Sequence, residues 1–454
     1  MTSENLHDLS FQQINLYKFD KLFNGTPIYN VGRVVEFIDD VDVERLQKVL
    51  NYLIRRHVLL RTKYIMRDNC IYQSVSPEFV PFRVIKVDSR FELVARINES
   101  IRKLFPLDSG QPFMVELYKL SEQCYVFIKA HHIACDMVSF AILLDEMIRL
   151  YNNADDGICE EQTVDNTYFS FVDYQRNYLY SKRGNLDADF WNRFVEKDIS
   201  PVKLDFEGNN IVKNYLGNYI SIKFDEKTSF RVSNLCKTSY ITPFKLFFSS
   251  FILTLSHYSG VTDMAVGTTV HNRINRNWRQ TIGNFANVIP VYVNFDKRLS
   301  ISDFMKLIDG VLYASFKHSF YPLERIVTKQ REQSRTTSDM FSLFQHVFVY
   351  QQTNFTDGFS MLTSPMDSEV NVSIEGSCLR PFKWLPPYSH FNTTLFMSGN
   401  EVSYFGYIEY SEELYKKEDI MSMRNVFYRI VLFIVENPSF SIDYILSKLS
   451  IAQC

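Results

Sequence analysis

The sequence predicts an α/β protein, an α+β sandwich, built from two related subdomains. Its 454 residues are too many for one ordinary hydrophobic core. A series of strand, helix, hairpin and helix patterns in the first half of the chain is loosely repeated in the second half. No Gly/Ser-rich linker separates the two halves, so we expect the subdomains to pack tightly.

The first half opens with a strand and an amphipathic helix. Thr26–Ile38 is rich in β-branched and aromatic residues, which favours a strand. Asp42 then precedes apolar residues at helical spacing, and this pattern ends near His57. Because Asp is a favoured N-cap residue, we expect the helix to begin directly after Asp42.

The pair His131 and His132 falls where a predicted hairpin ends. The two strands of the hairpin are Pro112–Leu120 and Gln123–Ala130, and Val138–Tyr151 then returns to helical spacing. A junction of this kind can project side chains from a rigid edge into a cleft. The pair is therefore the first candidate for a functional site. The polar segment 152–165 that follows is predicted to be a loop.

A similar series of elements follows in the second half. The expected strands are Tyr219–Phe224, Met264–Thr269, Val288–Asn294, His346–Gln351, Asn392–Phe396 and Val402–Tyr410, and the expected helices are Ala188–Val195, Pro243–Tyr258, Ile301–His318 and Lys417–Val435.

Composition narrows the classes of function. The net charge of -3 gives no electrostatic reason to expect binding to nucleic acid or to an anionic membrane. The seven Cys include no CxxC pair, which argues against a disulfide framework and a zinc site and is typical of a reducing compartment. The polar start of the chain predicts no signal peptide, and no apolar run is long enough to cross a membrane. We therefore expect a soluble cytoplasmic protein, and a monomer.

The six residues His131 to Asp136 allow more than one interpretation. A metal site would need further ligands at useful spacing, and Cys135 does not supply them. Asp136 could simply cap the helix that begins at Met137, and one His could be a core residue whose hydrogen bonds are satisfied there. A catalytic interpretation is equally compatible with these residues alone.

Other motifs, taken in chain order, identify a resemblance. Together with HHIACD they resemble the motifs of nonribosomal peptide synthetase condensation domains, members of the chloramphenicol-acetyltransferase-like superfamily, over essentially the whole chain. These motifs are Ser10–Gln13 (SFQQ), Arg56–Thr62 (RHVLLRT), Tyr168–Asp173 (YFSFVD), Val266–Arg273 (VGTTVHNR), Ile282–Asn287 (IGNFAN) and Phe320–Glu324 (FYPLE).

The resemblance implies two acetyltransferase-like subdomains in a V arrangement with the active site at their interface. We expect the boundary between residues 1–177 and 178–454. The resemblance also implies formation of an amide from a carrier-bound acyl or aminoacyl thioester and an amine, which is carrier-bound or soluble. No cofactor or metal is expected to bind, because phosphopantetheine arms of carrier proteins present the substrates.

The resemblance gives roles to individual residues. His132 is expected to act as a base or as a positioner of the amine, since an imidazole with a pKa near ~6.5 can accept its proton. His131 is expected to hold the loop. An ion pair between Asp136 and Arg273 is implied as a brace of the active site. Arg61 is assigned a structural role there, and a further set is expected to line the substrate tunnel: Met137, Ser139, Phe285 and Asn287.

Two departures from the family pattern bear on efficiency and acceptor type more than on the reaction class. The family has Gly where this chain has Met137, so Met137 is expected to narrow one side of the tunnel or to reshape the loop. The family's Glu of the Arg-His-Glu box is Val58, which we interpret as a structural change.

Two alternatives to condensation remain open. Epimerisation or ester-forming domains share the HHxxxD motif, although Ile282–Asn287 favours condensation. An inactive condensation-like domain could serve as a docking module for carrier proteins.

The chain carries no adenylation signature and no carrier Ser motif, so it is expected to be free-standing or excised, and the start at Met1 favours free-standing.

Overall fold

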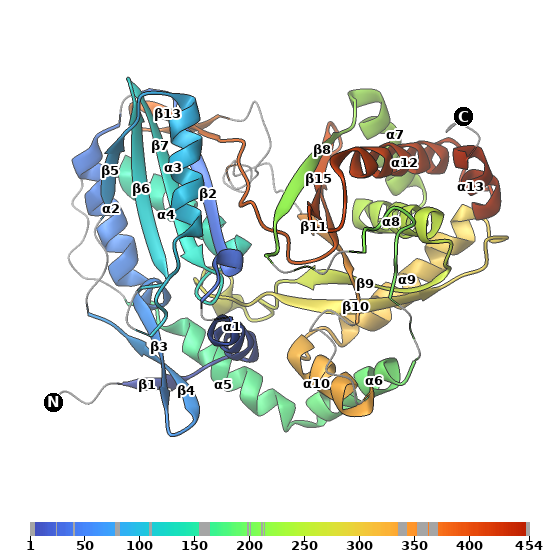
Figure 1. The fold of residues 1–454 in the computed structure, drawn as a ribbon, viewed down its shortest axis with the longest axis horizontal. Helices are drawn as coiled ribbons and strands as arrows, with labels where there is room; N and C mark the ends of the chain where they lie inside the picture. Colours follow the sequence, from blue (N-terminus) through green and yellow to red (C-terminus); the bar gives the residue numbers. More distant parts are fainter. Residues whose placement is uncertain are drawn as a thin grey trace. The chain divides into compact units, whose positions relative to one another are not determined.

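The computed structural model describes residues 5–450, except 24, 40, 78–81, 109–110, 154–163, 198, 200, 210–211, 213, 335–342, 352–361 and 363–370. The chain forms two compact units, each built from segments that are far apart in the sequence (Figure 1). Unit 1 contains residues 1–185, 271–286 and 354–386, and unit 2 contains residues 186–270, 287–353 and 387–454. The expected boundary at 177 and 178 stays a prediction.

A six-stranded sheet forms the centre of unit 1. Its order is β12-β13-β2-β7-β6-β5, so two late strands extend a sheet that is otherwise made by the first third of the chain. The strands are β2 (Asn30–Phe37), β5 (Arg83–Lys86), β6 (Phe113–Leu120), β7 (Gln123–His131), β12 (Val372–Ile374) and β13 (Ser377–Pro381). Strand β7 is buried from its second residue to its last, which indicates that both of its faces are covered.

Helices cover this sheet. Apolar residues of α3 (Arg90–Arg102) pack against β2, β6 and β7 in one hydrophobic cluster. Helix α2 (Val43–Arg56) and helix α4 (Met137–Asn152) pack against each other and lie on the other side of the sheet in Figure 1. The predicted cap Asp42 is present, because its carboxylate accepts a hydrogen bond from the Arg45 backbone at 3.0 Å.

The rest of unit 1 includes a small sheet of order β1-β4-β3. Its strands are β1 (Leu6–Asp8), β3 (Thr62–Arg67) and β4 (Cys70–Val75), and helices α1 (Phe11–Leu22) and α5 (Thr167–Leu179) complete the unit. The capping box of α1, in which Ser10 and Gln13 bond each other's backbone N–H, fixes where that helix begins.

Unit 2 is a second six-stranded sheet with helices packed on it. The strand order is β10-β9-β11-β14-β15-β8, with β11 parallel to both β9 and β14. The strands are β8 (Gly217–Lys223), β9 (Asp263–Val270), β10 (Asn287–Asn294), β11 (His346–Gln351), β14 (Thr393–Gly399) and β15 (Tyr404–Ser411). The helices are α6 (Lys182–Val195), which begins in unit 1, α7 (Glu226–Thr238), α8 (Pro243–Ser259), α9 (Ile301–Lys317), α10 (Leu323–Ser334), α12 (Lys417–Glu436) and α13 (Ile442–Ser450).

Two apolar clusters hold unit 2 together. The larger joins the sheet to α7, α8, α9, α12 and α13. The smaller joins β9, β10 and β11 to α6 and α10, with Trp191 among its buried members. Helices of the two clusters therefore pack on this sheet, α7, α8, α9, α12 and α13 in one and α6 and α10 in the other.

Most of the elements expected from the sequence are present. The strand expected at Thr26–Ile38 begins later, because Pro27–Tyr29 forms a 3₁₀ turn before β2. Much of the loop expected at 152–165 lies outside the described residues. Among the helices that the structure describes, none has the length and apolar character needed to cross a membrane.

Candidate active site

The histidine pair lies at the junction of β7 and α4, and backbone bonds fix it there. His131 is the last residue of β7, and its N–H donates to the Pro112 carbonyl at 2.8 Å. The N–H of Ile133 donates to Nδ1 of His131 at 3.1 Å, so Nδ1 acts as an acceptor. Burial lowers the pKa of His131 to about 3. His131 is therefore neutral and accepts a bond from within the loop, and its role at the site stays a prediction.

His132 is the more accessible member of the pair. Its side chain is partly exposed, whereas His131 is buried. Its backbone N–H donates to the Tyr29 carbonyl at 2.7 Å, which ties the loop to the start of β2. Burial lowers the pKa of His132, although its own carbonyl, the Asp136 carboxylate and the Cys135 carbonyl oppose the shift. The imidazole is thus neutral at neutral pH and can accept a proton.

Asp136 both caps helix α4 and forms an ion pair. Its Oδ1 accepts hydrogen bonds from the N–H and the hydroxyl of Ser139, at 2.9 and 2.8 Å. Arg273 donates from Nη1 to Oδ2 at 2.6 Å and from Nη2 to Oδ1 at 2.9 Å. Burial alone would raise the pKa of Asp136, but the Arg273 charge and the bonds from both partners hold it below the ordinary value. The two interpretations of Asp136, cap and ion pair, are both true.

Arg273 reaches this pair from a segment that follows strand β9. Residues 271–286 pack in unit 1, although β9 belongs to unit 2. The chain turns at Asn272, whose φ of 42° lies in the left-handed region that Asn tolerates better than most residues. Nη2 of Arg273 also donates to the Thr281 carbonyl at 3.2 Å, and the guanidinium lies 4.3 Å from the centroid of the Phe285 ring. The arginine therefore organises its own segment as well as the carboxylate.

Ser139 and Phe285, two residues expected along the substrate tunnel, are buried beside the ion pair of Asp136 and Arg273. The Ser139 hydroxyl, whose one hydrogen is directed to Asp136, accepts from the Gly283 N–H at 3.1 Å, and its oxygen lies 3.0 Å from the Gly283 carbonyl oxygen. The Phe285 ring is fully buried and packs edge-on to Tyr168 at 5.0 Å. The Phe285 N–H donates to Asp136 at 3.2 Å. Their observed contacts are structural, and a tunnel role for either stays a prediction.

Asn287 belongs to unit 2, where it joins two of the sequence motifs. Its Nδ2 donates to the carbonyls of Ser319 and Tyr321, both at 2.9 Å. Its Oδ1 accepts from the Leu323 N–H at 3.1 Å. With both ends of the amide bonded to backbone, Asn287 fixes the turn that leads into helix α10. Its assignment to the tunnel also stays a prediction.

Met137 and Arg61, the remaining residues predicted at the site, both lie in unit 1. Met137 is the first residue of α4 and is partly exposed, and its sulfur accepts a hydrogen bond from Nη2 of Arg33 at 2.9 Å. Arg33 was not singled out from the sequence. Arg61 bonds the carbonyls of Ser76 and Arg55 at 2.7 and 3.2 Å. Arg61 therefore has a structural role, but these bonds go to a loop after β4 and to α2, not to Asp136.

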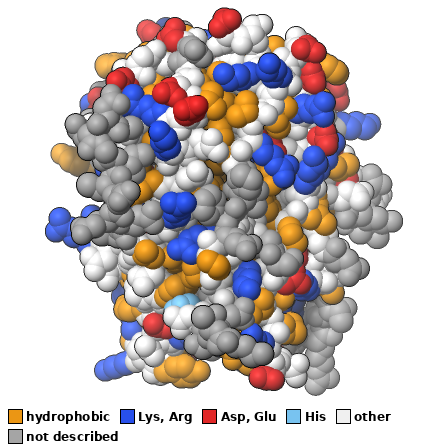
Figure 2. Space-filling view, turned by 90° about the vertical axis from the view of Figure 1, so that its left-hand side faces the viewer, with side chains coloured by type: hydrophobic (Ala, Val, Ile, Leu, Met, Phe, Trp, Pro, Cys, Tyr) orange, Lys and Arg blue, Asp and Glu red, His pale blue; other side chains and the backbone are white. Residues whose placement is uncertain are grey.

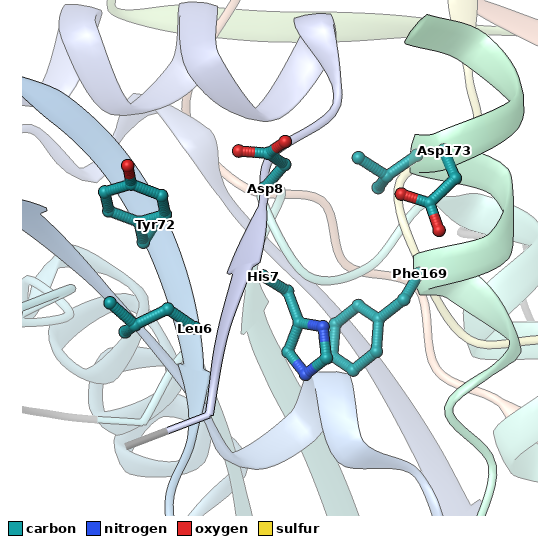
Figure 3. Close-up of a pocket in the computed structure, with 7 residues that line it drawn as sticks. Leu6, His7, Asp8, Tyr72, Phe169 and Asp173 are labelled. Carbon is teal, nitrogen blue, oxygen red and sulfur yellow. The ribbon is translucent and has the colours of Figure 1, made fainter. Parts of the chain in front are cut away.

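Unit 1 also has a pocket away from the histidine pair. Its volume is about 330 Å³, and it lies between β1 and α5, where the His7 ring stacks on Phe169 at 3.8 Å (Figure 3). None of the residues that line this pocket belongs to the loop from His131 to Asp136. On the face in Figure 2, the described basic side chains are interspersed with acidic and apolar ones. No group of three or more potential metal ligands occurs among the described residues.

Comparison with known proteins identifies the class. The fold is the mixed α/β fold with two sheet-containing subdomains that condensation domains share. This chain is similar in structure to the first condensation domain of the calcium-dependent antibiotic synthetase, with a TM-score of 0.79 and 15% identity. The similarity covers 97% of this chain and 99% of that one. The condensation domain family matches residues 3–447, so the chain belongs to the condensation domain family.

The curated relatives are synthases and synthetases that are much longer than this chain. Surfactin synthase subunit 1 of Bacillus subtilis is 23% identical over 441 residues, which is 96% of this chain and 12% of the relative. Phosphinothricin tripeptide synthetase PhsC of Streptomyces viridochromogenes is 25% identical over 418 residues, 90% of this chain and 37% of the relative. The chain thus spans only a small part of these relatives. The X-domain from teicoplanin biosynthesis has the same fold, with a TM-score of 0.83, 16% identity, and 97% and 98% of the two chains covered.

Proposed function

We propose that this chain catalyses amide-bond formation between an acyl or aminoacyl thioester on a carrier protein and an amine acceptor. The observation that carries the proposal is His132, a partly exposed and neutral imidazole on a loop that is braced from several sides. Such a group can act on a proton without needing a metal, and membership of the condensation family supports the same chemistry.

The reaction needs one bond made, one broken and one proton moved. The amine nitrogen attacks the thioester carbonyl carbon, and the carbon–sulfur bond breaks as the tetrahedral intermediate collapses. The nitrogen loses a proton, and the departing sulfur gains one to leave as a thiol. A neutral His132 can accept the proton or hold the amine by a hydrogen bond, and both roles remain open. Because thioesters are activated and amines are good nucleophiles, positioning can supply much of the acceleration.

The substrates proposed here are presented by carrier proteins on phosphopantetheine arms. Membership of the condensation domain family supports this, and so does the length of the relatives, of which this chain covers only a small part. One solved four-domain nonribosomal peptide synthetase is similar to this chain, with a TM-score of 0.85 and 19% identity over 97% of this chain and 34% of that one. We propose a donor carrier in every case and either a carrier-bound or a soluble amine as acceptor.

Reconstitution with a loaded carrier tests the proposal. Product would be followed by mass spectrometry after subtraction of uncatalysed aminolysis. We expect His132→Ala to abolish amide formation while the protein still folds. His257→Ala is the matched control, because His257 lies on α8 in unit 2 and makes none of the loop's bonds. Near-normal turnover in His132→Ala would remove this residue from the mechanism.

A docking module without catalysis is the second candidate. Two observations favour it. Met137 stands where the family pattern has Gly. An X-domain of this fold was solved in a complex with OxyB, and it matches this chain with a TM-score of 0.80 and 16% identity over 97% of this chain and 96% of that one. Saturable binding of carriers, with no product in any donor and acceptor combination, would favour docking over condensation. Racemised product without an amide bond would instead indicate an epimerising variant.

A further inference from the structure

A buried glutamine from helix α1 contacts the loop that carries His132. Gln13 donates from Nε2 to the carbonyl oxygen of Ile133 at 3.3 Å, and Ile133 directly follows His132 in the chain. The phenol of Tyr64, on strand β3, is 3.5 Å from the same oxygen. Gln13 and Tyr64 are both fully buried. One carbonyl of the loop is thus held by two donors from other elements of unit 1.

The orientation of the Gln13 amide is determined by its other contacts. Its Oε1 accepts the N–H of Ser10 at 3.0 Å in the capping box of α1, which directs Nε2 toward the loop. Nε2 also donates to Oε1 of Gln73 at 3.1 Å. The Tyr64 hydroxyl is a third acceptor of Nε2, at 3.4 Å, so the two hydrogens of this amide nitrogen are shared among Gln73, Ile133 and Tyr64.

Gln73 is itself held by a neighbouring strand. Its Nε2 donates to the Asp8 carbonyl at 2.6 Å, and Asp8 ends strand β1, which runs toward helix α1 (Figure 3). A continuous series of hydrogen bonds, partly buried at Asp8 and buried from Gln73 onward, therefore leads from β1 through Gln73 and Gln13 to the loop. Each amide in it has its orientation fixed, so the Ile133 peptide group has little freedom to rotate.

We propose that Gln13 is a positioning residue for His132: by binding the Ile133 carbonyl it sets the backbone of the loop from which the imidazole projects. The Tyr29 carbonyl holds the His132 N–H, and Gln13 holds the carbonyl one residue later. The two bonds together fix the peptide units on both sides of the imidazole. The consequence for activity rests on the proposed function, whereas the consequence for the geometry of His132 does not.

The test compares two buried glutamines of the same helix. Gln13→Met removes the donor to the loop, and Gln12→Met is the matched control. Gln12 is also buried, but it bonds Gln175 of α5 at 3.0 Å and not the loop. We expect Gln13→Met to lower kcat by about 10- to 100-fold with KM for the loaded carrier nearly unchanged, because small misplacements of a reacting group are costly. We expect Gln12→Met to keep kcat within about twofold of the original protein.

A second readout does not need turnover. The imidazole signal of His132 would be assigned in an NMR spectrum of histidine-labelled protein by its loss in His132→Ala. In Gln13→Met we expect this signal to shift and its titration midpoint to change, and in Gln12→Met we expect neither. If Gln13→Met leaves both the signal and kcat at the values of Gln12→Met, the proposal is overturned.

Tyr64→Phe covers the case in which Gln13→Met does not fold. It deletes only the hydroxyl that lies near the Ile133 oxygen and Gln13, so we expect a smaller shift of the His132 signal and a smaller loss of kcat. An unchanged signal together with an unchanged kcat in Tyr64→Phe would then overturn the proposal. If the original protein makes no amide at all, the proposed function fails, and the NMR comparison still decides the positioning role.

Discussion

Arg273 and Asp136 form a bidentate ion pair, although the two residues are 137 positions apart in the chain. The pair is buried: 4% of the Arg273 side chain and 3% of the Asp136 side chain are exposed. The same carboxylate caps helix α4 through Ser139 and accepts the Phe285 N–H. The loop with His132 therefore ends on a residue that is bonded both to its own helix and to a distant segment. The Asp136 side chain thus connects the start of helix α4 to the segment 271–286.

The first prediction separates the cap from the ion pair. Asp136→Asn keeps a good N-cap residue but removes the charge, whereas Asp136→Ala removes both. We expect each of Asp136→Ala and Arg273→Ala to lower the free energy of unfolding by about 3–5 kcal/mol. Each substitution leaves the charge of the other residue buried without an opposite charge beside it. Asp136→Asn should lose most of this amount if the ion pair dominates, and urea denaturation measures all three.

A double mutant provides the control for this prediction. Asp136→Ala with Arg273→Ala should cost less than the sum of the single changes, because the two residues share one interaction. Asp145 and Arg149 form an exposed pair on the same helix, and removing it should cost only about 0.5 kcal/mol or less. Strict additivity of the Asp136 and Arg273 changes would show that they do not stabilise the fold as a pair.

The second prediction concerns Gly283, whose backbone bonds Ser139. A Cβ at Gly283 would lie 2.1 and 2.4 Å from ring atoms of Tyr168. That ring cannot move easily, since its hydroxyl bonds the Asn284 carbonyl at 2.8 Å. We expect Gly283→Ala to destabilise unit 1 by about 1–3 kcal/mol through overpacking. Thermal unfolding would measure this loss.

Gly310 is the matched control for Gly283. It lies inside α9, and among the described residues no atom beyond its chain neighbours and the nearby backbone of its own helix lies within 4 Å of the Cβ that a substitution would add. Gly310→Ala should therefore stabilise the protein by about 0.5–1 kcal/mol, because alanine is the better helix former. Equal effects of the two substitutions would contradict the close contact between Gly283 and Tyr168.

The third prediction tests whether Met137 affects the acceptor. Met137→Gly removes the thioether that Arg33 contacts and restores the residue of the family pattern. We expect it to change the rate with a carrier-bound amine more than the rate with a soluble amine, and to leave donor loading unchanged. Met137→Leu, which keeps the volume without the sulfur, separates the effect of space from that of the contact. Equal changes with both acceptors would leave Met137 without a specific role.

The parts of the fold that were predictable are those with strong local patterns. The apolar run before His131 and the Asp42 cap indicated a strand and a helix start that match β7 and α2 closely. The hairpin of β3 and β4 was missed because its strands mix polar and apolar residues. A signal for it exists: Asp68 and Asn69, both at positive φ, form a two-residue turn of a kind that Asp and Asn favour.

The remaining features depend on long-range packing and have no local signal. Residues 271–286 pack in unit 1 and β13 pairs with β2, although both segments are far from that unit's first strands in sequence. No periodicity within one segment encodes such a placement. For the same reason the resemblance suggested the pair of Asp136 and Arg273, but the bonds of Gln13 to the loop could only be found in the structure.

The last prediction concerns pH and a buried histidine outside the proposed catalytic loop. His57 caps the end of α2, and its ring lies between two carboxylates, with Nε2 2.7 Å from Glu146 of α4 and Nδ1 3.4 Å from Asp165. Arg56 is the other charged group nearby, 3.7 Å from Glu146. The contact also secures the backbone bridge between His57 and Asp165.

The signs of the two pKa shifts define a pH window. Burial alone would lower the pKa of His57, but Asp165 and Glu146 hold it above the ordinary value. Its contribution to stability is therefore complete below the unfolded pKa near ~6.5 and is lost as pH rises through the higher folded pKa. The pKa of Asp165 is held low by His57 and Thr167 against the effect of burial, so its contribution is lost only as pH falls well below ~3.9.

We therefore expect the stabilisation by His57 to be greatest between about pH 4 and 6.5 and to decline above that range. Urea denaturation of the original protein and of His57→Gln at several pH values measures it. At pH 6 the variant should lose about 1.5–3 kcal/mol, the usual contribution of a hydrogen bond to a charged group, and the loss should shrink toward pH 9. His7→Gln is the control, because His7 lies in the pocket between β1 and α5, where burial holds its pKa low. A difference between His57→Gln and the original protein that stays constant from pH 5 to 9 would mean that His57 is not charged in the folded state.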